Sequence, residues 1–396
     1  MAASNRIYSI DIMRGLNLIL MLFVNDLYMK GVPAWLGHRA ANFDGMGLAD
    51  WVFPGFLFMV GMSVPYSIGN RIDKGENNYF ISKHILIRTV SLLIIGVLMS
   101  NSRNVSLENT GISKSLWSFI MYSGVFLVWN QYKKTDKNFY FITGLRILGI
   151  AMILAMVYIF RSGDMGNNSF SLKGWGILGT IGWGYFVAAF IYLGVRNNIS
   201  KTAIALLFFL ALNILSKLHL LDFLNPVKSV LGVIINGNAP FIVISGMFIT
   251  LILKRLSLKN VTKTVLTIVS LGSLSIIGGF FLRHWFIISK IQSTPSWGLI
   301  CNGISILLFA LLFWIIDIRK HVKWASFLKP AGENSLTIYL VPDMFYYIIW
   351  GFGLPLLFYK NSDIPLIVIT GSIVWALVMG VGLAALLAKL KFKLRL

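Results

Sequence analysis

Long apolar stretches recur along the chain and are separated by short polar connections. Most have about 17–25 residues, the length that an α-helix needs to cross the hydrocarbon core of a bilayer. Several are shorter, so ten or eleven spans would also be compatible with the pattern. We predict an all-α polytopic membrane protein, a bundle of about 12 (10–12) transmembrane helices, near residues 12–29, 48–69, 84–100, 115–130, 139–160, 177–195, 202–216, 229–253, 264–282, 298–316, 334–352 and 364–388.

Composition excludes a soluble protein. Hydrophobic residues fill 57% of the 396 positions and charged residues only 12%, which is too few to cover a water-exposed surface. No connection between the apolar stretches is long enough for a soluble domain. Residues 1–396 are therefore predicted to form one transmembrane domain.

The net charge is +21, and the distribution of the Lys and Arg residues along the chain indicates how the helices are oriented. About two thirds of the Lys and Arg residues fall in alternate connections that include both termini, and cytoplasmic loops retain positive charge. Both termini are therefore predicted to be cytoplasmic. No basic stripe with interleaved aromatic residues indicates nucleic acid, and the lipid bilayer is the expected partner of these charges.

Polar side chains gather between the first and second predicted helices. Asn25 and Asp26 end the first apolar stretch, His38 lies in the following loop, and Asp44 and Asp50 precede the second stretch. An imidazole titrates near neutrality, and a carboxylate at its far nitrogen would fix its tautomer and raise its basicity. The patch therefore has the parts needed for proton transfer. The alternative is an interfacial loop histidine, with Asp50 as an N-cap.

A second polar group lies at the cytoplasmic start of the first helix. Two arginines, Arg6 and Arg14, flank Asp11, and such a set could hold a phosphorylated cofactor. The alternative is positive-inside anchoring with an Asp–Arg pair at i, i+3. Composition alone favours this alternative.

Candidate substrate-binding residues also lie in the second half of the chain. Lys290 and Trp297 flank a run of hydroxyl residues, which suits an anionic or sugar ligand or equally an aromatic belt with a snorkelling lysine. Asn334 lies at the start of the eleventh predicted helix, and Asp343 lies inside that helix, where a carboxyl group needs a partner or a cavity. With Asp26, these residues complete the expected substrate-binding set.

Metal-binding patterns are missing from the sequence. Cys301 is the one cysteine and lies in an apolar stretch, so neither an intrachain disulfide nor a cysteine metal site can form. His84, His219 and His321 have no second histidine or carboxylate at metal-ligand spacing. We predict no metal site and assign these three histidines no role.

Several short segments near the start of the chain together resemble the heparan-alpha-glucosaminide N-acetyltransferase family. They follow one another in a fixed order, as Ser9–Gly15 (SIDIMRG), Phe23–Asp26 (FVND), His38 and Ala49–Phe58 (ADWVFPGFLF). The similarity is most specific over roughly the first seventy residues. Weaker similarity occurs at Lys290–Leu299 and Gly332–Tyr339, and the loop from Asn25 to His38 departs from the family pattern.

The resemblance implies acetylation across a membrane. Acetyl-CoA would be supplied in the cytosol as co-substrate, and the amine of a glucosamine-type sugar, as in heparan sulfate, would accept the acetyl group on the far side. In a bacterial relative this is the periplasmic side of the inner membrane. The resemblance aligns His38 with the family's catalytic histidine, Asn25 with its active-site asparagine and Asp50 with the aspartate of its A-D-x-x-F-P segment. We expect Arg14 and Arg6 near the CoA phosphates.

Alternatives stay open at this stage. His38 can act as general base with Asn25 as oxyanion donor, which we favour, or can itself carry the acetyl group. An O-acyltransferase of cell-surface glycans would use the same base, and a secondary transporter of a sugar or amphipathic substrate would share the helical architecture. Oligomeric state is not defined by the sequence, and a homodimer is one compatible assembly.

Overall fold

The computed structural model describes residues 7–29, 32–133, 139–163, 170–171, 174–256 and 260–396. These residues contain no β-strand and two isolated bridges. The helices are α1 (Tyr8–Asp26), α2 (Leu48–Asp73), α3 (Asn78–Ser102), α4 (Leu107–Thr110), α5 (Lys114–Trp129), α6 (Phe139–Ile159), α7 (Gly176–Val195), α8 (Ile199–Lys217), α9 (Lys228–Asn236), α10 (Asn238–Leu256), α11 (Val261–Leu282), α12 (Pro295–Leu312), α13 (Lys329–Glu333), α14 (Ser335–Gly351), α15 (Pro365–Leu377) and α16 (Ala384–Lys389). Shorter 3-10 and π segments extend or join them: η3 (Asp222–Val227), η5 (Phe313–Ile318), η6 (Lys323–Leu328), η7 (Pro355–Asn361) and η8 (Val378–Leu383).

The helices confirm the predicted all-α polytopic membrane protein. Within the described residues, ten helical stretches are long and apolar enough to cross a membrane, or eleven if α14 and η7 form one broken span. Two of the twelve predicted spans account for the difference. Helix α5 has 16 residues, slightly short for a full span, and α14 bends by 99° into η7.

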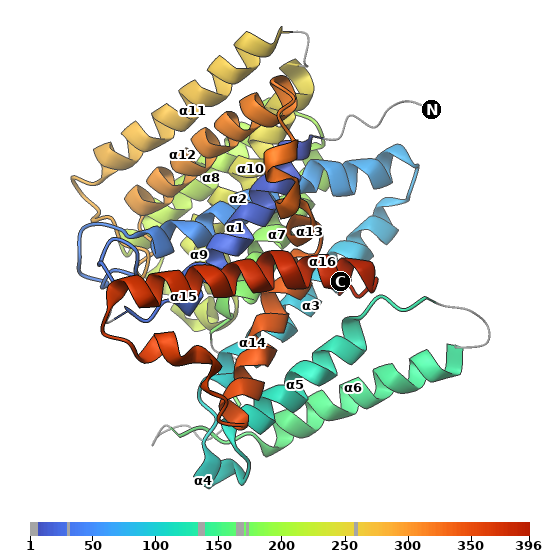
Figure 1. The fold of residues 1–396 in the computed structure, drawn as a ribbon. Coiled ribbons are helices and arrows are strands. Elements are labelled where there is room, and N and C mark those ends of the chain that lie inside the picture. Colours follow the sequence, from blue (N-terminus) through green and yellow to red (C-terminus); the bar gives the residue numbers. More distant parts are fainter. Residues whose placement is uncertain (1–6, 30–31, 134–138, 164–169, 172–173, 257–259) are drawn as a thin grey trace.

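The bundle is built around α1, α2 and α10 (Figure 1). Helix α2 packs against both α1 and α10, α3 packs against α7, and the pairs α5/α6 and α11/α12 lie on opposite flanks. Helices α8 and α11 bury little of their apolar surface inside the bundle, whereas α1 is mostly buried. Since an apolar helix face needs lipid or protein around it, α8 and α11 face lipid and α1 belongs to the core.

Close approach of α2 and α10 depends on two glycines. A Cβ atom on Gly61 would collide with the carbonyl oxygen of Val243, and one on Gly246 would collide with that of Phe58. Small residues let membrane helices pack backbone to backbone. This contact fixes the position of α2, the helix that carries residues of both functional regions described below.

The start of α1 and the C-terminal segment lie at the same end of the bundle. The carboxylate of Asp317 accepts hydrogen bonds from the backbone N–H groups of Tyr8 (2.8 Å) and Ser9 (3.0 Å) and so caps α1. At this end, Arg14 and Arg395 line one cavity. The predicted cytoplasmic location of both termini requires this arrangement, and the side of the membrane stays a prediction.

Candidate active site

Asp50 organises the polar residues at one end of the bundle. It is the third residue of α2, and its Oδ2 atom accepts hydrogen bonds from the backbone N–H groups of Gly47 (3.0 Å) and Arg39 (3.1 Å). Its Oδ1 atom lies 2.8 Å from Nδ1 of His38. The sequence offered two interpretations of Asp50, as a helix cap and as a partner of His38. The same carboxylate makes both contacts.

The imidazole of His38 is held from one side and open on the other. An ionised carboxylate can only accept, so the contact with Asp50 places the proton on Nδ1 and leaves a lone pair on Nε2. Nε2 has no hydrogen-bond partner among the residues that the structure describes, and the side chain is 43% exposed. A neutral His38 can thus take a proton at Nε2 from an approaching group.

A second loop covers the loop that carries His38. The carboxylate of Asp44 accepts hydrogen bonds from the backbone N–H of Ile288 and from Nε of Arg283, both at 2.8 Å. The hydrogen bond from the Ile288 backbone is the main cause that lowers the pKa of Asp44. The Arg283 guanidinium acts in the same direction. We call these two segments, residues 32–47 and 283–294, the paired loops, and their end of the bundle the His38 end.

Lys290 reaches from the paired loops to the histidine. Its Nζ atom lies 3.2 Å from Nδ1 of His38 and 3.9 Å from Oδ1 of Asp50, and it donates a hydrogen bond to the carbonyl of Ala49 (3.1 Å). Burial lowers the pKa of this lysine, and the charge of Asp50 acts in the opposite direction. The sequence placed Lys290 in a separate group, and the structure joins it to His38.

Other predicted residues at this end lie apart from the histidine. Asn25 is exposed on the last turn of α1, and no described hydrogen bond joins it to His38. Asp26 is buried and contacts Lys360 Nζ (2.8 Å), the Tyr359 hydroxyl (2.8 Å) and the Tyr346 hydroxyl.

Trp297 lies in the first turn of α12 and is 3% exposed, so it offers no open ring face. Asp343 is also inside the bundle, where it accepts a hydrogen bond from the Tyr122 hydroxyl (2.7 Å). Arg6 lies outside the described residues. The predicted ligand-binding roles of these residues stay predictions.

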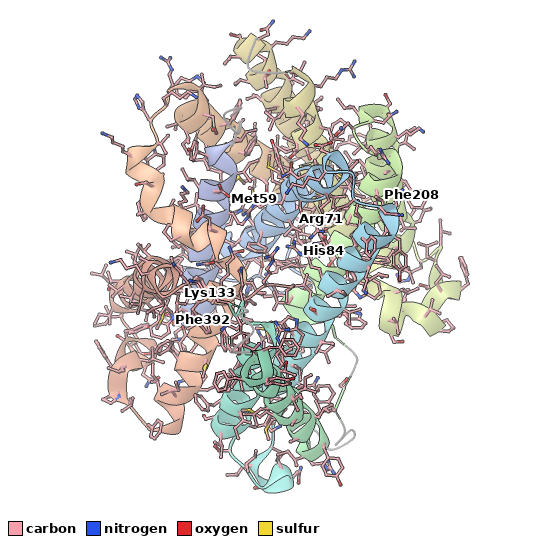
Figure 2. All side chains as sticks on the ribbon, turned by 90° about the vertical axis from the view of Figure 1, so that its right-hand side faces the viewer. Met59, Arg71, His84, Lys133, Phe208 and Phe392 are labelled. Carbon is pink, nitrogen blue, oxygen red and sulfur yellow. The ribbon has the colours of Figure 1, made fainter. Side chains whose placement is uncertain are left out.

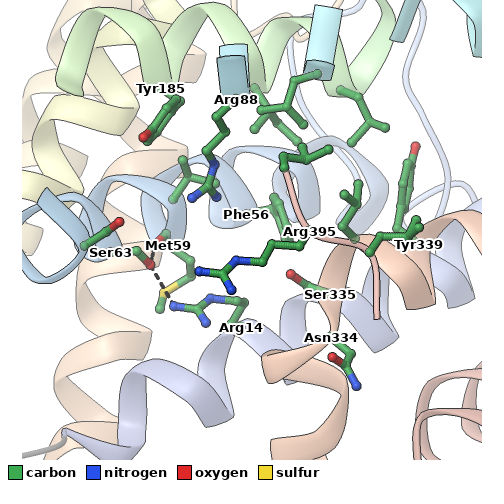
Figure 3. Close-up of a pocket in the computed structure, with 18 of the residues that line it drawn as sticks. Arg14, Phe56, Met59, Ser63, Arg88, Tyr185, Asn334, Ser335, Tyr339 and Arg395 are labelled. Carbon is green, nitrogen blue, oxygen red and sulfur yellow. Dashed lines mark hydrogen bonds between the residues drawn. The ribbon is translucent and has the colours of Figure 1, made fainter. Parts of the chain in front are cut away.

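At the opposite end, which we call the cavity end, lies a cavity of about 390 Å³. Arg14 extends into it from α1, and its guanidinium donates hydrogen bonds to Ser63 Oγ (2.7 Å) and the Gly332 carbonyl (3.3 Å). Asn334 also lines this cavity, so the structure places it with Arg14 and away from Lys290 and Trp297. Figure 3 shows Arg14, Asn334 and their neighbours around the cavity.

Cations from distant parts of the chain share this cavity. In Figure 3, the head groups of Arg88 from α3, Arg395 from the C-terminal segment and Arg14 point toward one another. Arg71 and Lys393 complete the set. Glu333 is the one carboxylate side chain among the described lining residues. Arg14 and Arg71 have carboxylate partners in Asp11 (3.4 Å) and Glu76 (2.7 Å), and the remaining excess of positive charge around the cavity favours binding of an anion.

Sequence reasoning missed most of this cavity. It assigned no role to His84, which lines the cavity with Arg71 and Met59. Figure 2 labels these three residues. Burial also lowers the pKa of Lys393, and the nearby positive charges of Arg14 and Arg395 act in the same direction. The sequence does contain one sign of this cavity: Arg88 is a basic residue inside an apolar stretch, and such residues are costly in a membrane.

Both functional regions use the same two helices. The cavity lining extends along α1 from Arg14 to Met21 and along α2 from Arg71 to Phe56. At a rise of about 1.5 Å per residue, Met21 is roughly 6 Å below Asn25 along its helix. By the same rise, Phe56 is roughly 9 Å below Asp50.

Asn17 lies on the stretch of α1 that runs beside the cavity, between Arg14 and Met21, but it does not itself line the cavity. It is fully buried, and its side-chain oxygen and nitrogen have no described partner. A Cβ atom added to Gly55 of α2 would contact this amide, so α2 packs directly against it. The contact between α1 and α2 therefore contains an amide whose hydrogen-bonding capacity is unused among the described residues.

Among the described residues, no group of three or more His, Cys, Asp or Glu side chains is placed to hold a metal ion.

Comparison with known proteins confirms the predicted resemblance over the N-terminal part. Residues 6–113 match the family described as heparan-alpha-glucosaminide N-acetyltransferase, catalytic. Two proteins named heparan-alpha-glucosaminide N-acetyltransferase, from Mus musculus and Homo sapiens, are each 35% identical to this chain, over 100 and 96 residues. These stretches are 25% and 24% of this chain but only 15% and 14% of the relatives' own lengths.

Proposed function

From this family match we propose that the protein is a transmembrane N-acetyltransferase, which moves the acetyl group of acetyl-CoA to the amine of a glucosamine-type sugar. One observation carries the proposal: the matched segment 6–113 supplies both ends of the site. It contributes Arg14 and Arg88 to the cavity, and His38 and Asp50 to the opposite end. A donor bound at one end and an acceptor bound at the other are what acetylation across a membrane requires.

The cavity suits the nucleotide end of acetyl-CoA. Arginine guanidinium groups bind phosphate oxygens through paired charge-assisted hydrogen bonds, and four arginines line the cavity with one lysine. The apolar lining residues, such as Phe56 and Met59, give the remaining wall a surface for the uncharged parts of the ligand. We place the cavity end in the cytosol, because positively charged loops stay on that side, and the His38 end on the periplasmic side of a bacterial inner membrane.

The arm of the donor would run along α1 and α2 toward His38. Asn17, on the stretch of α1 beside the cavity, has both side-chain polar atoms without a described partner, and the arm of CoA carries amide groups that can satisfy them. The thioester would then reach the end of α1, where Asn25 is exposed.

The chemistry follows from the geometry of His38. The amine of the acceptor attacks the thioester carbonyl carbon, Nε2 takes a proton from the amine, and the Asn25 amide donates to the oxyanion. Collapse of the tetrahedral intermediate breaks the C–S bond, and the CoA thiolate leaves. Asp50 keeps the proton on Nδ1 throughout, so Nε2 is the atom that exchanges protons.

Direct transfer competes with a two-step route in which Nε2 of His38 carries the acetyl group. Incubation with acetyl-CoA alone and mass spectrometry of the peptide containing His38 separates them. An acetylated peptide would support the two-step route. Its absence, together with transfer when the acceptor is added, would support direct attack.

The proposed function is tested with purified protein in detergent. We expect saturable binding of acetyl-CoA, and acetylation of glucosamine that is lost in His38→Ala while acetyl-CoA binding is retained. His284→Ala, which removes an exposed histidine of the paired loops, is the matched control and should keep the activity. Absence of acetyl-CoA binding by folded protein would favour the transporter. Transfer to hydroxyl acceptors alone would favour the O-acyltransferase.

A further inference from the structure

Two charged side chains compete for one nitrogen of His38. Nδ1 lies 2.8 Å from Asp50 Oδ1 and 3.2 Å from Lys290 Nζ. This nitrogen has one position in the ring plane, which holds either a hydrogen or a lone pair. It can donate to Asp50 or accept from Lys290, but it cannot do both at once.

Each choice gives His38 a different chemistry. Donation from Nδ1 to Asp50 leaves Nε2 as a lone pair that can accept a proton. Acceptance from Lys290 would place the hydrogen on Nε2, which could then only donate. The remaining contacts favour the first state, because Lys290 has a carbonyl acceptor at Ala49 (3.1 Å) for one hydrogen and lies 3.9 Å from the Asp50 carboxylate.

Charge acts on the same ring in a second way. A buried carboxylate beside an imidazole stabilises the doubly protonated ring, which can no longer act as a base. Asp50 is 1% exposed, so water screens its charge poorly. The ammonium of Lys290 balances that charge and opposes addition of a second proton to His38.

The other charged groups around these elements are engaged with different partners. On the paired loops, the Arg39 guanidinium lies over the ring of Phe43 (4.6 Å), and Arg283 pairs with Asp44. On α1, Asp26 is paired with Lys360. On α12, Cys301 is fully buried and its thiol faces the Met46 sulfur. Within the described chain, the charges that contact the His38 ring are those of Asp50 and Lys290.

We propose that Lys290 is a positioning residue that keeps His38 neutral, with its proton on Nδ1, so that Nε2 is available as a base. This inference rests on the proposed function of His38 as the proton acceptor. It gives Lys290 a role different from the sugar or anion contact expected from sequence, since its ammonium is directed at protein groups. The paired loops, held together through Asp44 and Ile288, deliver this lysine from a segment far along the chain.

The first measurement is the pH dependence of His38 reactivity in the full-length protein. Diethyl pyrocarbonate modifies neutral imidazole, and mass spectrometry of the His38 peptide gives the pH at which half of the maximal rate is reached. In Lys290→Met we expect this midpoint to rise by about one pH unit or more, because a unit charge at this distance contributes about that much even at the dielectric constant of water. Lys290→Arg keeps the charge and should keep the wild-type midpoint.

The second measurement is the pH profile of acetyl transfer by the same variants. The acid limb of the profile should move upward in Lys290→Met by the same amount, with the rate at high pH within a few-fold of wild type. Lys114→Met is the matched control, because this lysine donates to the Arg103 carbonyl and is remote from His38 in sequence and contacts. It should leave both midpoints unchanged.

The outcomes separate this inference from the proposed function. An unchanged or lower midpoint in folded Lys290→Met would overturn the inference, and a raised KM for the acceptor with an unchanged midpoint would return Lys290 to substrate binding. A shifted midpoint of modification in a protein that transfers no acetyl group would support the charge effect and overturn the enzymatic proposal. If Lys290→Met fails to fold, Lys290→Gln, which removes the charge but keeps a polar end, takes its place: a raised midpoint supports the inference, and an unchanged or lower midpoint overturns it.

Discussion

The carboxylate of Asp50 orients the imidazole of His38 and at the same time caps the helix on which it lies. One oxygen contacts Nδ1 of the ring at 2.8 Å, and the other accepts the backbone N–H groups of Gly47 and Arg39. Because the carboxylate is fixed by backbone atoms, the ring is held by a rigid partner. Orientation of His38 is thus tied directly to the start of α2.

Replacing Asp50 by asparagine tests this link. Asp50→Asn keeps the size of the side chain but loses the ionised acceptor, so the Nδ1–H tautomer of His38 is no longer enforced. We expect kcat for acetyl transfer to fall about 10²–10⁴-fold, as for loss of general-base function. The amide oxygen of asparagine can still accept from the Gly47 and Arg39 backbone N–H groups, so the stability of the protein should change little. Asp73→Asn, at the other end of the same helix, should keep wild-type kcat, and near-normal kcat in Asp50→Asn would contradict the assigned role.

The cavity arginines should determine donor affinity. Arg88→Gln and Arg395→Gln each remove a charge from the cavity, and a hydrogen bond to a charged group contributes about 1.5–3 kcal/mol. We expect each substitution to raise the Kd of acetyl-CoA by about 10-fold or more, measured by calorimetry in detergent, and to flatten its salt dependence. Arg146→Gln on α6 is the control, because Arg146 lies over the Tyr132 ring and does not line the cavity. Equal Kd values for all three variants would place the donor elsewhere.

The paired loops should loosen in acid. The pKa of Asp44 is lowered from 3.8, chiefly by the hydrogen bond from the Ile288 backbone. A lowered folded-state pKa means that Asp44 stabilises the fold above its unfolded value and that this contribution is lost as the pH falls through the lowered pKa. The thermal midpoint of wild type should therefore exceed that of Asp44→Asn at pH 6, and this difference should begin to shrink as the pH falls below about 4.

Thermal melts of both proteins between pH 3 and 6 measure this difference. Asp363→Asn, a substitution of an exposed loop carboxylate, serves as the control and should track wild type throughout. A constant difference between wild type and Asp44→Asn across the range would show that Asp44 acts without titrating.

Asp26 and Lys360 should behave as one unit. The carboxylate of Asp26 is fully buried and contacts the Lys360 ammonium at 2.8 Å. Lys360→Met leaves that charge buried with only tyrosine hydroxyls, and breaking a buried pair in this way costs about 3–5 kcal/mol. The double variant Asp26→Asn/Lys360→Met should recover part of the lost thermal stability, because it removes both charges. Additive losses in the double variant would show that the pair is not coupled.

Contact between α2 and α10 should tolerate no side chain at Gly61. In Gly61→Ala the added carbon meets a backbone carbonyl oxygen that no rotamer change can move, and overpacking of this kind costs about 1–3 kcal/mol or more. Gly144→Ala on α6 places its carbon in open space and should be neutral or stabilising by about 0.4–1 kcal/mol. Gel filtration in detergent and thermal melting of the two variants provide the comparison. Equal stability of both would mean that the helices can separate.

The sequence by itself determined the membrane class and the two ends of α1. An apolar stretch in a bilayer has to satisfy its own backbone hydrogen bonds, so length and hydrophobicity alone predict a helix. Even the two deviating spans, α5 and α14, are helices at the predicted positions. Regular helical rise likewise places Arg14 and Asn25 at opposite ends of one helix, and spacing in the first seventy residues was enough to indicate the family.

Only the tertiary structure decided which distant residues share a site. Lys290 and His38 come together because two loops pair through Asp44, and Arg395 joins Arg14 because the C-terminal segment folds back over the cavity. Almost every face of these helices is apolar, so the sequence pattern does not say which face meets which neighbour. That choice depends on small residues such as Gly61 and on long-range side-chain contacts, and these exist only once the helices have packed.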